Sequence, residues 1–155
     1  MRLPAPVHIP RRALRKLDRL GLEKHFNGEV DGMPYSVYKL IHFLGIFALL
    51  ITLTAACMHV LRGGTRADNP HRRTLGAVHG IAVFLILLGG FGMLARLGIV
   101  QGGLPTWIWL KLVIWVMLGF ALMVIYRGVR FARPLMIAVP LFALLAAAIA
   151  LYKPF

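Results

Sequence analysis

Four side chains that could bind a cofactor or an anion, or carry a proton, lie inside long apolar stretches: His42, His59, His79 and Lys111. Neutral imidazole ligates haem iron, and an ammonium group pairs with anions. Carboxylates are missing from these stretches, since the five acids are Asp18, Glu23, Glu29, Asp31 and Asp68. A buried carboxylate relay is therefore excluded. With Ser36 as the single serine, a buried Ser-His-Asp triad is excluded too. The sequence predicts no catalytic residue.

The segments that position these side chains are long enough to cross a bilayer. The chain has 155 residues, of which 59% are apolar, and its mean hydropathy is +0.78. Between Lys39 and Arg62 about 22 uncharged residues would span roughly 33 Å as a helix, close to the thickness of the hydrocarbon core. We predict an all-α integral membrane bundle of four transmembrane helices, with spans at about residues 35–61, 74–96, 105–127 and 135–152.

A polar, basic tail, residues 1–34, precedes this membrane domain, residues 35–155. Within the tail, residues 11–26 read as one amphipathic helix, because Leu14, Leu17 and Leu20 gather on one side and basic residues crowd the remainder. Such a helix lies on a membrane surface or docks on a partner, and the alternative is a solvated, partly frayed helix.

The chain carries 18 Lys and Arg against 5 Asp and Glu, a net charge of +13. Most basic residues flank apolar runs, so membrane topology and lipid headgroups explain them better than nucleic acid does, and no nucleic-acid partner is expected. Four spans put both termini on one side of the membrane, called side A. The loops after the first and third spans lie on side B and carry seven arginines, which favours a cytoplasmic side B. The basic tail on side A argues for the opposite orientation.

Depth in the membrane sorts the polar side chains into two pairs. His42 and Lys111 each lie six or seven residues in from side A, at depths of roughly 9–10 Å. His59 and His79 lie nearer side B. Each can be an interfacial residue whose polar group reaches a headgroup or a backbone carbonyl. Alternatively, His42 or the His59/His79 pair ligates a b-type haem, or His42 and Lys111 bind a lipid, a quinone or a porphyrin intermediate. No metal is assigned.

Small residues also mark these spans. Gly76-x-x-x-Gly80 in the second span would allow a neighbouring helix to approach closely, and the three alanines at 146–148 would do so in the fourth. The single cysteine, Cys57, rules out an intrachain disulfide.

Three short motifs resemble a group of small bacterial membrane proteins with four or five spans: Tyr38-Lys39-Leu40-Ile41-His42-Phe43, His79-Gly80 followed by residues 87–92, and Trp109-Leu110-Lys111-Leu112. The group includes the SirB-type family, the copper-resistance CopD domain and the HemJ-type protoporphyrinogen oxidase. The resemblance implies a bacterial inner membrane location and puts His42 and Lys111 at the functional site. A HemJ-type relative would associate with haem and oxidise porphyrinogen, and a CopD-type relative would handle copper.

These observations favour a non-enzymatic, multi-pass membrane protein. We expect an accessory or scaffold subunit whose partners are the lipid bilayer and the other subunits of a larger membrane complex. The alternative is a b-type haem or porphyrin-binding membrane protein with a redox role.

Overall fold

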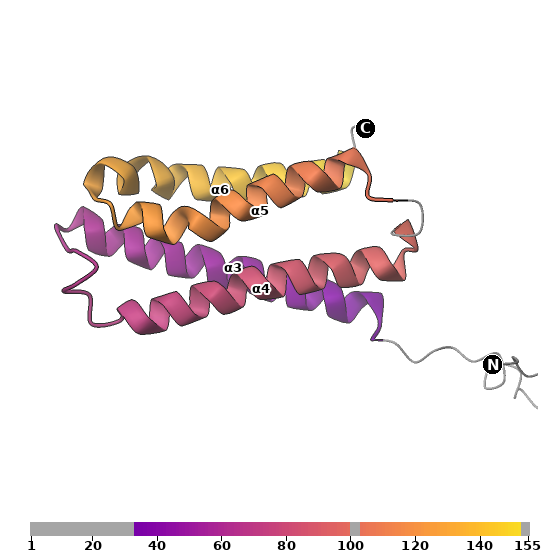
Figure 1. The fold of residues 1–155 in the computed structure, drawn as a ribbon, viewed down its shortest axis with the longest axis horizontal. Coiled ribbons are helices and arrows are strands. Elements are labelled where there is room, and N and C mark those ends of the chain that lie inside the picture. The colour runs from indigo at the N-terminus through magenta and orange to yellow at the C-terminus, as the bar shows by residue number, and fades with distance from the viewer. Residues whose placement is uncertain (1–32, 100–102, 153–155) are drawn as a thin grey trace, which may run out of the picture. The chain divides into compact units, whose positions relative to one another are not determined.

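The computed structural model describes residues 33–99 and 103–152, and the predicted amphipathic helix of the tail lies outside these residues. Pro34–Phe155 form one compact unit. The described part is built from four α-helices: α3 (Tyr35–Leu61), α4 (Arg72–Arg96), α5 (Thr106–Ile125) and α6 (Val129–Tyr152) (Figure 1). All four are long and apolar enough to cross a membrane. The predicted all-α bundle of four membrane-spanning helices is therefore confirmed.

Helix α6 begins earlier than the sequence predicts. The expected span starts at Leu135, after a loop that ends at Pro134, yet the helix starts at Val129, directly after Gly128 with its φ of +126°. Two prolines, Pro134 and Pro140, consequently lie inside the helix. Proline is tolerated in membrane helices because neighbouring helices and local adjustments satisfy the backbone groups that it frees.

Helix α3 is the element that contacts all of the others. It packs most extensively against α4 and also contacts α5 and α6, whereas α4 and α6 do not contact each other. The α3–α4 loop and the α5–α6 turn lie at one end of the bundle, on the left in Figure 1, which is side B. The start of α3 and the start of α5 lie at the other end, side A.

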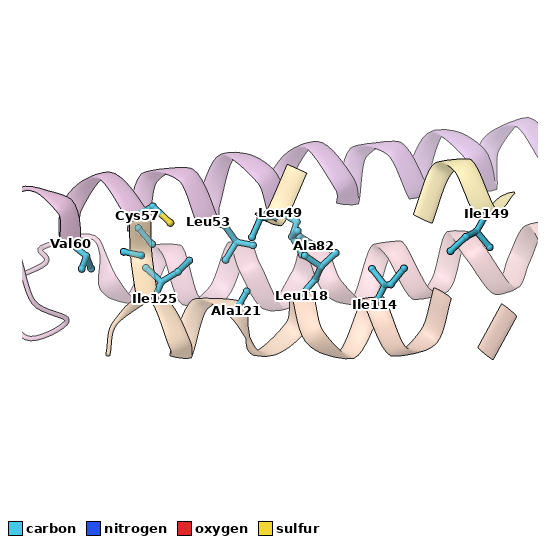
Figure 2. Close-up of a cluster of buried hydrophobic side chains, with 13 residues drawn as sticks. Leu49, Leu53, Cys57, Val60, Ala82, Ile114, Leu118, Ala121, Ile125 and Ile149 are labelled. Carbon is cyan, nitrogen blue, oxygen red and sulfur yellow. The ribbon is translucent and has the colours of Figure 1, made fainter. Parts of the chain in front are cut away.

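A narrow line of buried aliphatic side chains holds the helices together. Figure 2 shows Leu49, Leu53 and Val60 of α3 facing Leu118 and Ile125 of α5. Large apolar side chains elsewhere face outward, among them Leu40, Phe47 and Ile51, which are 63–70% exposed. Lipid tails are as apolar as leucine, so a membrane covers these faces at no cost.

Glycines allow α3 and α4 to approach backbone to backbone. A Cβ atom added at Gly45 would lie 2.8 Å from the carbonyl oxygen of Ala82, and one at Gly89 would lie 2.7 Å from that of Tyr38. By contrast, Gly76 and Gly80 have no neighbour within 4 Å of an added Cβ. The close approach inside this bundle therefore uses Gly45 and Gly89, while the Gly76-x-x-x-Gly80 motif faces outward.

A matched pair of substitutions on α4 tests this contact. Gly89→Ala should lower the free energy of unfolding by about 1–3 kcal/mol, because the new methyl group meets rigid backbone atoms of α3. Gly80→Ala should be neutral or stabilising by up to about 1 kcal/mol, since the site is open and alanine is the better helix former. Thermal unfolding of the two variants in detergent measures the difference. Equal stabilities would contradict the contact.

Candidate functional site

His42 of α3 lies half-buried against α4. Its Nδ1 atom is 2.7 Å from the carbonyl oxygen of Ile86. A carbonyl only accepts hydrogen bonds, so Nδ1 carries the proton and donates, which leaves the lone pair on Nε2. Gly89 and Gly90 line this contact, and a Cβ added at Gly90 would lie 3.6 Å from the imidazole ring. The ring is thus fixed in the tautomer that suits an Nε2 ligand.

Lys111 of α5 is the second member of the predicted side-A pair. Its Nζ atom lies 5.9 Å from the centroid of the Trp107 ring, within the range of a cation–π contact. His42 and Lys111 lie in the side-A halves of α3 and α5, two helices that contact each other. The half-buried ammonium remains available to an anion there.

His79 of α4 is buried, with 7% of its surface exposed. Its Nε2 atom donates to the carbonyl oxygen of Gly119 on α5 over 2.9 Å. Trp115 of α5 donates in the opposite direction, from Nε1 to the carbonyl oxygen of Val83 on α4, also over 2.9 Å. These two bonds link α4 to α5. The other ring nitrogen of His79, Nδ1, is buried without a hydrogen-bond partner.

His59 closes the loop between α3 and α4. Its Nε2 atom lies 2.9 Å from the Thr65 carbonyl oxygen and 2.9 Å from Oδ1 of Asp68, so one N–H serves two acceptors. Oδ1 of Asp68 also accepts the backbone N–H of Thr65 over 2.7 Å. No described contact joins His59 to His79. The two histidines of the predicted side-B pair therefore have separate roles: His59 closes the α3–α4 loop, and His79 links α4 to α5.

A second polar contact on side B joins the two loops. Asn69, which is 4% exposed, donates from Nδ2 to the hydroxyl of Tyr126 over 2.9 Å. Its Oδ1 atom accepts the backbone N–H of His71. Sequence reasoning missed this residue, although Asn69-Pro70 was visible as a turn signal. The partner could not have been chosen from the sequence, because Tyr126 lies 57 positions away.

The intramembrane polar groups thus serve mainly to join helices. His42, His79 and Trp115 each donate to a backbone carbonyl of a neighbouring helix. Three groups could still bind a ligand: Nε2 of His42, Nδ1 of His79 and the ammonium of Lys111. Within residues 33–99 and 103–152, no group of three or more His, Cys, Asp or Glu side chains could hold a metal ion.

Comparisons of the chain with protein-family models, with curated proteins and with solved structures find no match.

The Asp68 contacts predict a pH dependence of the loop. The hydrogen bond from His59, together with that from the Thr65 backbone, holds the pKa of Asp68 below its ordinary value of 3.8. The carboxylate therefore stabilises the folded loop fully above that ordinary value, and this contribution is lost as the pH falls through the lowered pKa.

Asp68→Asn provides the measurement, because an amide oxygen can accept the same two hydrogen bonds without titrating. Melting temperatures in detergent across the acidic range should fall more steeply for the wild-type protein than for the variant. Parallel curves for the two proteins would show that Asp68 contributes nothing to the pH dependence.

Proposed function

We propose that this protein is a non-enzymatic accessory or scaffold subunit that packs, within the membrane, against a larger complex. One observation carries the proposal: α4 exposes the small residues Gly76, Ala77 and Gly80, and a Cβ added at either glycine would have no neighbour within 4 Å. Small residues at such spacing let the backbone of another membrane helix approach closely. The occupant that we propose is a transmembrane helix of a partner protein.

The interior of the bundle supports the same proposal. The polar side chains that could take part in chemistry are largely committed to holding α4 between α3 and α5. Helix α6 packs on α3 and α5 through a few buried residues, Ala132, Val139 and Ile149, while only 11% of its most apolar window is buried. A four-helix bundle with wide exposed apolar faces suits a subunit that presents surfaces to its neighbours.

Co-purification under gentle detergent tests the proposal. The tagged wild-type protein should bring down a membrane partner, and Gly80→Leu should lose that partner because the larger side chain fills the open face. The melting temperature of Gly80→Leu should stay unchanged, since the site is empty within the bundle. Leu141→Ala, at an exposed position on α6 outside the small-residue faces, is the control and should keep the partner. A monodisperse wild-type monomer without a partner would overturn the proposal.

The second candidate function is binding of a b-type haem or a porphyrin at His42. The observation that favours it is the hydrogen bond from Nδ1 of His42 to Ile86, which leaves Nε2 as a ligand, the arrangement usual for metal-bound histidine. The ammonium of Lys111 would pair with a propionate. A bound haem would supply one-electron redox chemistry, while the chain would hold and orient it.

An absorption spectrum of the protein purified from haem-supplied cells tests this candidate. The wild type should show a Soret band, and His42→Ala should lose it while its melting temperature confirms a folded bundle. His71→Ala, an exposed histidine in the α3–α4 loop, is the matched control and should keep the band. A colourless wild-type protein would exclude haem, and a band that survives in His42→Ala would exclude this ligand.

A further inference from the structure

We propose that the side-B end of the bundle is a binding site for the headgroups of acidic phospholipids in the adjoining leaflet. The proposal is independent of the function proposed above. The site is formed by seven exposed arginines, called the arginine end: Arg62, Arg66, Arg72, Arg73, Arg127, Arg130 and Arg133.

The fold gathers these arginines from two separate parts of the chain. The bond from Asn69 to Tyr126 ties the α3–α4 loop to the first residue of the α5–α6 turn, directly after α5. Arg72 and Arg73 follow Asn69 closely, and Arg127 directly follows Tyr126. This one hydrogen bond therefore links two basic segments that are far apart in the sequence. Figure 1 shows both connections at the same end of the bundle.

The charge at this end is strongly unbalanced. Asp68 is the single acid among the described residues, and its Oδ1 atom already accepts hydrogen bonds from His59 and Thr65. The arginines therefore lack enough carboxylates to pair with inside the described chain. Phosphate diesters are the complementary groups, because a guanidinium can donate two parallel hydrogen bonds to one phosphate.

The site has a shape as well as a charge. An open hollow of about 320 Å³ is lined by Ala67, Asp68, Asn69, Pro70, Arg72 and Arg73. Arg72 donates from a guanidinium nitrogen to the carbonyl oxygen of Ala67, which holds the side chain across the loop. The guanidinium carbon of Arg130 lies 6.0 Å from the centroid of the Phe131 ring. At least two of the seven side chains are thus oriented before any ligand arrives.

The neighbouring surface favours a lipid over a soluble polyanion. Val129 and Phe131, at the start of α6, are 42% and 39% exposed, and Met136 and Ile137, further along the same helix, are 38% and 66% exposed. A phospholipid can place its phosphate among the arginines and its acyl chains along this apolar face. Inorganic phosphate or a nucleic acid would use only the charged part.

The test is a titration of the full-length protein in detergent, with bound lipid counted by native mass spectrometry. The probes are phosphatidylglycerol and, for comparison, zwitterionic phosphatidylcholine. Arg66, Arg73 and Arg127 are replaced together, because they are exposed and distributed over both connections. Each replaced arginine should weaken phosphatidylglycerol binding about fivefold, so the triple glutamine variant should bind about a hundredfold less tightly.

Two matched variants separate charge from structure. The triple Arg→Lys variant keeps the charge and should keep most of the binding. Asp68→Asn removes the one acid from the hollow while retaining acceptors for His59 and Thr65, and it should bind phosphatidylglycerol more tightly. Melting temperatures in zwitterionic detergent show that each variant is folded. Should the triple variant fail to fold, Arg73→Gln alone should still show the fivefold loss.

Several results would overturn the proposal. Wild-type protein that binds phosphatidylcholine as tightly as phosphatidylglycerol has no headgroup site for acidic lipids. If the triple glutamine variant or Arg73→Gln is folded and binds phosphatidylglycerol with unchanged affinity, the lipid site does not lie at the arginine end. Full competition by millimolar inorganic phosphate would show a free-phosphate site in place of a lipid site, whereas weak competition supports the lipid.

Discussion

The close packing of α3 on α4 is the constraint on which the other contacts depend. Gly45 and Gly89 remove the side chains that would otherwise hold the two backbones apart. Because the helices approach so closely, the imidazole of His42 reaches the Ile86 carbonyl. Helix α4 is then held in the orientation from which His79 reaches α5. A methyl group at Gly89 would push α4 away from α3, because it would meet the α3 backbone. The contacts of His42 and His79 depend on that approach.

The intramembrane hydrogen bonds follow one physical rule. Water is scarce in the hydrocarbon core, so a polar side chain there must find its partner within the protein. Helix carbonyls retain a second lone pair after accepting their own intrahelical bond, and they can accept a further donor without breaking the helix. His42, His79 and Trp115 all use this acceptor. These bonds use one ring nitrogen of His42 and one of His79, so the second nitrogen of each ring is the atom that could bind a ligand.

The two ends of the bundle differ in character. Side B is built from polar contacts, with His59, Thr65 and Asp68 closing one loop and Asn69 joining it to Tyr126. These contacts join two basic segments that are far apart in the sequence. Side A holds His42 and Lys111, which lie within helices α3 and α5.

The sequence by itself determined the fold class, because about 20 apolar residues between charges match the thickness of a bilayer whatever the packing. It also predicted a common depth for His42 and Lys111, since depth depends only on counting residues along a helix. It could not determine how each helix is rotated about its axis. Only the tertiary structure decided that Gly45 and Gly89 face inward and Gly76 and Gly80 outward. The partner of Asn69 was likewise settled by a contact between distant segments, because local residue patterns carry no information on which part of the chain lies opposite.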